Sequence, residues 1–227
     1  MGLNPVATEL STAATDAVLA VLALACIRWL AIRMSEEPVK TRLWILVLAL
    51  LAVASILGAV AHGFALSGDA IYLLWQPLFL SLGLVVALFV IAAVYDGVGP
   101  DAARRLLIPG LVVGAGFYLV TLLFPGTFLV FVLYEASAML AALVLYGRLA
   151  ARSGERWTWF MVLGIALNIL AAGIQASGEV RLNLGIPFDH NGVFHLVQMV
   201  AIVTLVAGVG MSLPGGSHHT ESKTNEV

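Results

Sequence analysis

Three histidines in apolar surroundings, His62, His190 and His195, are the residues of this sequence best suited to chemistry. Three histidines and a water or carboxylate form the ligand set of a catalytic zinc site, which lowers the pKa of bound water to about 7. Asp16 and Glu135 also lie in apolar stretches. They are candidate catalytic groups, each as a general base, a fourth ligand or an orienting partner of a histidine. These residue types predict zinc as a cofactor.

The same residues have a structural interpretation that stays open. Histidine, Asn and Gln side chains bridge membrane helices by hydrogen bonds of roughly 0.6–2 kcal/mol each. A carboxylate inside a bundle can be protonated or paired with a neighbouring histidine. For one histidine alone, bridging is the better interpretation. Three histidines at one depth, with two carboxylates nearby, favour the metal site.

The elements that position these groups are transmembrane helices. Of the 227 residues, 61% are hydrophobic and 11% are charged, which is too apolar for a protein whose surface is covered by water. A helix crosses the hydrocarbon core with about 20 apolar residues, and the chain predicts an all-α bundle of seven such helices. The expected helices are Ala13–Arg33, Arg42–Leu66, Ala70–Tyr95, Ala103–Leu123, Thr127–Gly147, Trp157–Ser177 and His190–Met211.

The basic residues predict the orientation of the bundle, because Lys and Arg near helix ends are retained in the cytoplasm. Ten of the 11 basic residues fall on one side of the expected helices, and only Arg181 falls on the other. The N-terminus is therefore expected outside and the C-terminus in the cytoplasm. The expected location is the plasma (inner) membrane, with residues 1–211 forming the helical domain and 212–227 a disordered cytoplasmic tail.

Polar residues are costly inside a bilayer and should face the bundle interior. Asn191, His195 and Gln198 follow an i, i+4, i+7 spacing, which places them on one face of the last helix. Asp189 precedes that helix and is a candidate N-cap. With Gln76 of the third helix, Asn191 and Gln198 are the candidate substrate-binding residues. All of these lie toward the outer side, whereas Glu9, Asp69 and Glu179 are expected in solvated outer loops or helix ends.

The local sequences Ala61–Phe64 and Asp189–His195 resemble those of the CREST superfamily of seven-helix proteins. This group includes the alkaline ceramidases and the progestin and adipoQ receptors, and the closer likeness is to an uncharacterised bacterial branch. The resemblance implies a zinc-dependent hydrolase whose metal-bound water attacks a lipid amide or ester, with zinc held by His62, His190 and His195. The sequence departs from the pattern where Gly58 replaces a serine and where His190 and His195 are five residues apart instead of four.

Two further classes of membrane protein compete with a hydrolase. A receptor, or a protein that binds or transports a small molecule or ion, would use the same outer polar cavity. A retinal protein needs an intramembrane lysine, and Lys40 and Lys223 are expected outside the helices. There is no basic patch suited to nucleic acid. Membrane lipids are the expected partners, including a possible lipid substrate.

Overall fold

The computed structural model describes residues 2–34, 37–124 and 129–214 and confirms the all-α, seven-helix architecture. All seven helices are long and apolar enough to cross a membrane, so the chain is a multi-pass membrane protein. The helices are α1 (Ala7–Ala31), α2 (Pro38–Gly63), α3 (Gly68–Gly97), α4 (Pro100–Leu123), α5 (Leu129–Ser153), α6 (Arg156–Ser177) and α7 (His190–Ser212). A short hairpin of β1 (Leu182–Asn183) and β2 (Pro187–Phe188) separates α6 from α7.

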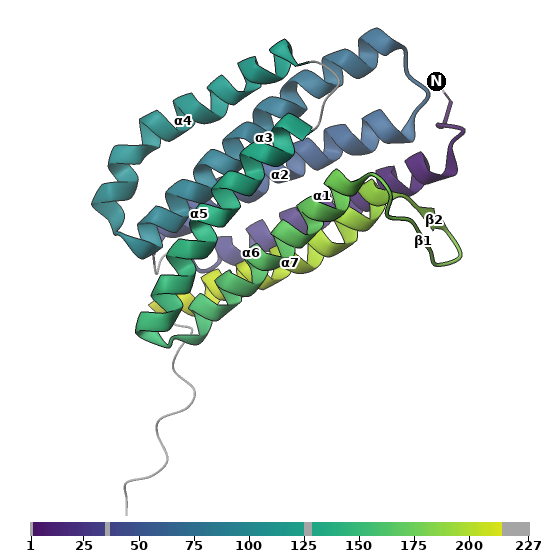
Figure 1. Ribbon diagram of the computed structural model, residues 1–227. Helices are drawn as coiled ribbons and strands as arrows, with labels where there is room; N and C mark the ends of the chain where they lie inside the picture. The colour runs from purple at the N-terminus through teal and green to yellow at the C-terminus, as the bar shows by residue number, and fades with distance from the viewer. Residues whose placement is uncertain (1, 35–36, 125–128, 215–227) are drawn as a thin grey trace, which may run out of the picture.

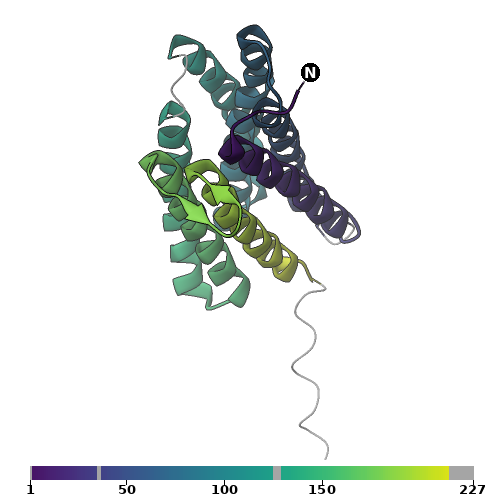
Figure 2. The same cartoon turned by 90° about the vertical axis from the view of Figure 1, so that its right-hand side faces the viewer.

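Six helices form a closed ring, and the seventh lies outside it. Going round the ring, α1 packs on α2, α2 on α3, α3 on α5, α5 on α6, α6 on α7, and α7 returns to α1. Helix α4 packs mainly against α3 at the periphery, as Figures 1 and 2 show. The first and last helices are therefore neighbours, and residues far apart in the sequence meet between them.

Several helix ends differ from the sequence prediction. Helix α1 begins at Ala7 instead of Ala13, because polar residues before Ala13 are already helical and face the bundle. Helix α2 ends at Gly63, which leaves His62 in its final turn. Thr127 lies outside the described residues, as does the expected tail from residue 215 onward. Helix α7 includes Ser212, and Leu213 is buried, so ordered structure extends past the predicted start of the tail.

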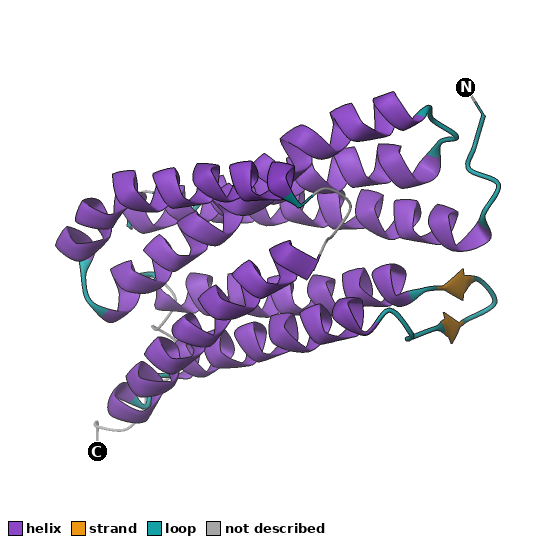
Figure 3. Ribbon diagram, turned by 45° about the horizontal axis from the view of Figure 1, so that its top comes forward, coloured by secondary structure: helices purple, strands orange, loops and turns teal. Residues whose placement is uncertain are grey.

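The outer end, where α1 and α7 begin, carries more structure than the sequence predicts. Leu3 pairs with Phe64 in an antiparallel bridge, so the N-terminal segment is tied to the end of α2. The β1–β2 hairpin lies at the same end of the bundle (Figure 3). Its turn contains Gly185 at φ 85°, a left-handed conformation that glycine adopts without steric cost.

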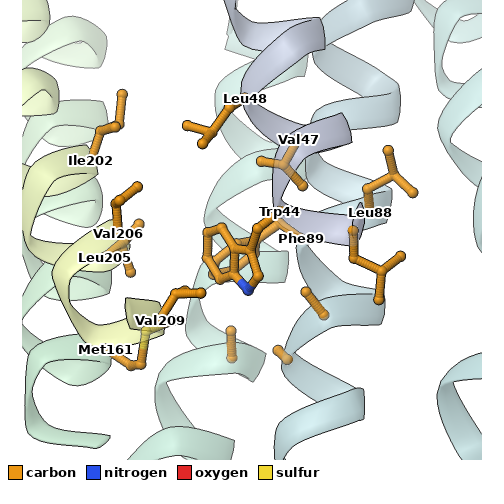
Figure 4. Packing of buried hydrophobic residues seen from close by; sticks show 14 of the residues in the cluster. Trp44, Val47, Leu48, Leu88, Phe89, Met161, Ile202, Leu205, Val206 and Val209 are labelled. Atoms are coloured by element: carbon orange, nitrogen blue, oxygen red, sulfur yellow. The ribbon is translucent and has the colours of Figure 1, made fainter. Parts of the chain in front are cut away.

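The inner half of the ring is filled by apolar side chains. Figure 4 shows Trp44 of α2 and Phe89 of α3 facing Val206 and Val209 of α7, with Met161 of α6 below them. The rings of Trp44 and Phe89 meet edge to face, with centroids 5.8 Å apart. This packed layer closes the bundle toward its inner end, the end expected to face the cytoplasm.

A buried ion pair lies at the inner end and corrects one expectation. Lys40, expected outside the helices, lies in the first turn of α2, and its Nζ is 2.7 Å from Oδ1 of Asp96 at the end of α3. Tyr146 of α5 donates its hydroxyl to Oδ2 of the same carboxylate at 2.7 Å. The ammonium also lies 4.8 Å from the ring centroid of Trp157 in α6. The Lys40–Asp96 pair thus joins four helices, and this pairing makes Lys40 a structural group.

Candidate functional site

A cavity of about 290 Å³ opens between the helices of the ring in their outer half. Apolar and aromatic side chains form most of its wall, among them Trp75, Phe131, Met139 and Phe194. Its polar lining residues are Asp16, Ser55, His62, Glu135, Gln175, His190, Asn191, His195 and Gln198. Seven of the eight candidate site residues from the sequence therefore meet at one cavity.

The polar face of α1 fixes the start of α7. Asp189 is the N-cap of α7, as predicted, and its Oδ1 accepts hydrogen bonds from the backbone N–H groups of Asn191 and Gly192, both at 3.0 Å. Thr12 donates its hydroxyl to the same oxygen at 3.1 Å. Ser11 donates to the backbone carbonyl of Pro187 at 2.7 Å. These bonds fix the first turn of α7 against α1, which sets the depth of His195.

His195 is held between two residues of α1. Its Nδ1 is 2.9 Å from the Thr15 hydroxyl, and its Nε2 is 3.3 Å from Oδ1 of Asp16. All three side chains are buried. Gly58 of α2 makes room for this carboxylate, because a Cβ at position 58 would lie 2.7 Å from Oδ2 of Asp16. The glycine at position 58 thus accommodates Asp16.

His62 is oriented by Glu9, a residue that was expected to be solvated at the outer side. Oε2 of Glu9 lies 2.6 Å from Nδ1 of His62, and 34% of the Glu9 side chain is exposed. Glu9 is therefore partly solvated at a helix end, as expected, and also has a partner that the sequence did not predict. The signal was present in the sequence, since Glu9, Thr12 and Asp16 follow an i, i+3, i+7 spacing that places them on one helix face.

Two buried acceptor atoms of residues that line the cavity have no hydrogen-bond partner in the described part of the chain: Oε2 of Glu135 and Oε1 of Gln175. The Glu135 side chain comes from the second turn of α5, and the residue is only 6% exposed. Gln175 donates through Nε2 to Oδ1 of Asn191 at 3.4 Å, so its amide oxygen is left without a donor. Two residues of the cavity wall therefore each have a buried oxygen that the described protein leaves unsatisfied.

Gln76 does not line the cavity. It accepts a hydrogen bond from the Tyr118 hydroxyl at 2.9 Å and donates to the Tyr72 carbonyl at 3.1 Å, so it bridges α3 and α4. Asn191 and Gln198 do reach the cavity, on the same face of α7 as His195. Of the three candidate substrate-binding residues, only these two are positioned to contact a molecule there.

The possible ligands of the predicted zinc site do not lie close together. Within the described ranges, no three His, Cys, Asp or Glu side chains converge closely enough to hold a metal ion. His62, His190, His195 and Asp16 share the cavity, but Nδ1 of His62 contacts Glu9, and the two ring nitrogens of His195 contact Thr15 and Asp16. In this arrangement the three histidines and Asp16 are not gathered around one metal position.

Comparison with known proteins gives one match. The model of a family described as "Family of unknown function (DUF6962)" covers residues 11–213, which includes every cavity-lining residue named above. No curated protein and no solved structure matches the chain. The resemblance to the CREST superfamily therefore stays a prediction.

Proposed function

The chain belongs to the DUF6962 family, and we propose that it binds a small molecule with polar and apolar parts in the outer cavity of its helix ring. The observation that carries this proposal is the gathering of nine polar residues and several aromatic ones around one cavity. Small-molecule sites have this composition: mostly apolar walls with a few placed polar groups. We place this activity in the plasma (inner) membrane, with the cavity opening to the outside.

The closed inner half supports binding over transport. The apolar layer around Trp44, Met161 and Val209 lies between the cavity and the paired Lys40 and Asp96 at the inner end. Ionisable residues that mark a transport pathway would continue across the bilayer. A molecule in the cavity thus has access from one side.

Analysis of molecules that co-purify with the protein tests the proposal. The protein in lipid nanodiscs is denatured, and the extract is compared by mass spectrometry with that of Ser55→Leu, which fills a buried position on the cavity wall. Val53→Leu is the matched control, because Val53 is on the same helix and is 45% exposed toward lipid. We expect a molecule in near-equal amount to the chain in wild type and Val53→Leu, and its loss in Ser55→Leu. Equal retention in all three proteins contradicts the proposal.

Zinc-dependent hydrolysis of a lipid amide or ester is the second candidate function. The observation that favours it is the Glu9–His62 pair, because carboxylates bound to histidine Nδ1 orient the ring toward metals in zinc proteins. Elemental mass spectrometry of wild type, His62→Ala and His195→Ala after metal-replete purification tests it. Near one zinc per chain in wild type alone supports this candidate, and wild type without zinc eliminates it.

A further inference from the structure

We infer that the ligand of the outer cavity is an amine with an apolar body, whose ammonium group hydrogen-bonds Oε2 of Glu135 and Oε1 of Gln175. The inference rests on the proposed binding function and names the chemical class of the ligand. The unsatisfied atoms at the cavity carry the argument, and the charges of its walls and its apolar surface support it.

With Glu135 ionised, the two unsatisfied atoms are both acceptors. A buried polar atom without a partner costs about 1–3 kcal/mol, so a ligand that satisfies both atoms gains on entering the cavity. An ammonium group carries three donors and no acceptor. A carboxylate or phosphate ligand would add acceptors and would leave the two oxygens of the cavity wall without a donor. Oε2 of Glu135 and Oε1 of Gln175 thus select for a donor.

The charges on the cavity wall favour a cation. Asp16 and Glu135 line it, and no Lys or Arg is among its described lining residues. Asp16 has His195 as a neighbour, whereas Oε2 of Glu135 has no partner. A carboxylate inside a membrane bundle is commonly the counter-ion of a bound ligand. Glu135 is placed to serve an ammonium in this way.

The remainder of the cavity fits the apolar part of such a ligand. Phe131 lies one turn before Glu135 on α5, and Met139 lies one turn after it, and both line the cavity. An aromatic or alkyl group attached to the amine would bury its surface there at about 25 cal/mol per Å². The ring of Trp75 also lines the cavity and can contribute a cation–π contact.

Calorimetric titration of the protein in phosphatidylcholine nanodiscs tests the inference with three probes of one shape: phenethylamine, 2-phenylethanol and phenylacetate. Empty nanodiscs correct for partitioning into lipid. We expect phenethylamine to bind at least ten-fold more tightly than the alcohol, and phenylacetate to bind more weakly still. Equal affinity for the amine and either analogue, or no binding of the amine, overturns the inference.

Variants test whether Glu135 and Gln175 are responsible for phenethylamine binding. Glu135→Gln should weaken phenethylamine binding at least ten-fold, and the matched control Glu179→Gln, at an exposed outer position, should leave it unchanged. If Glu135→Gln unfolds, as thermal unfolding would reveal, Gln175→Leu provides the second variant and should weaken binding as well. Wild-type affinity in a folded acceptor variant overturns the inference.

The outcomes separate this inference from the proposed function. A neutral or acidic molecule that co-purifies with wild type and is lost in Ser55→Leu supports a binding function and eliminates the amine. Absence of any co-purified molecule, together with no binding of the three probes, eliminates both.

Discussion

The Glu9 carboxylate lies 2.6 Å from Nδ1 of His62, and this contact joins the first turn of α1 to the last turn of α2. Glu9 contacts Nδ1 and therefore does not contact Nε2, the other ring nitrogen of His62. The His62 side chain lines the cavity. The same two segments are also joined by backbone hydrogen bonds from Asn4 to Gly63 and from Ala65 to Gly2. The outer rim of the cavity is therefore tied together near the N-terminus.

Replacing Glu9 should affect ligand retention more than stability. The pair is partly exposed, and such pairs contribute about 0–1 kcal/mol. Glu9→Gln removes the charge that orients His62, so we expect a small decrease in melting temperature and a several-fold loss of the co-purified molecule. Native mass spectrometry and thermal unfolding measure the two effects. Glu179→Gln is the control. Unchanged retention of the molecule in Glu9→Gln would show that the Glu9–His62 pair has only a structural role.

Breaking the Lys40–Asp96 pair should strongly destabilise the bundle. Both side chains are buried, and removing one partner leaves an uncompensated charge at a cost of about 3–5 kcal/mol. Asp96→Asn should therefore lower the free energy of unfolding by about that amount in a denaturant titration. The exposed Asp101→Asn should change little. The double variant Lys40→Met/Asp96→Leu should recover much of the loss, and an additive loss would contradict the pairing.

Adding a methyl group at Gly58 should displace Asp16 from His195. The new Cβ would lie 2.7 Å from Oδ2 of Asp16, closer than real Cβ atoms approach another atom, and 3.0 Å from its Cγ. Gly58→Ala should cost about 1–3 kcal/mol of stability and should lower ligand retention as the carboxylate moves. Gly116→Ala is the matched control, because nothing lies within 4 Å of its Cβ position. Full retention in Gly58→Ala would show that Asp16 does not shape the site.

Disrupting the contact between α3 and α4 should lower stability without affecting ligand retention. A Cβ at Gly83 would lie 2.5 Å from the carbonyl oxygen of Gly114, which leaves no space for a side chain. Close approach of small residues is a common way for membrane helices to pack. Gly83→Val should lower the melting temperature by several degrees with the co-purified molecule retained, because α4 contributes no residue to the cavity wall. Gly116→Val is the control on α4, and loss of the molecule in Gly83→Val would contradict this separation.

The fold was predictable where the physical requirement is simple. Seven long apolar stretches have few alternatives to seven helices, and the confirmed N-cap at Asp189 has a direct local cause. The beginning of α1 was misplaced because Glu9 and Thr12 look like residues outside a membrane, although their partners on α2 and α7 place them in the bundle. Lys40 was misplaced for the same reason, since its partner Asp96 is 56 positions later.

The site was predictable as a gathering of residues but not as a geometry. Helical spacing placed Asn191, His195 and Gln198 on one face, and the cost of polar groups in lipid directed that face inward. Whether His62, His190 and His195 meet at metal-binding distance depends on rotamers and on neighbours such as Thr15, which no spacing rule supplies. The unsatisfied oxygens of Glu135 and Gln175 follow only from the packed structure.

The ring order has a consequence for biosynthesis. The Thr15–His195 contact joins residues 180 positions apart, so at about 5–20 residues per second the ribosome needs roughly 9–36 s to supply the partner. During that interval α1 exposes Thr12, Thr15 and Asp16 without the helix that will pair with them. Completion of the last helix ends this exposure and forms the cavity at the same time, so the proposed ligand binding requires that α7 has been made and assembled.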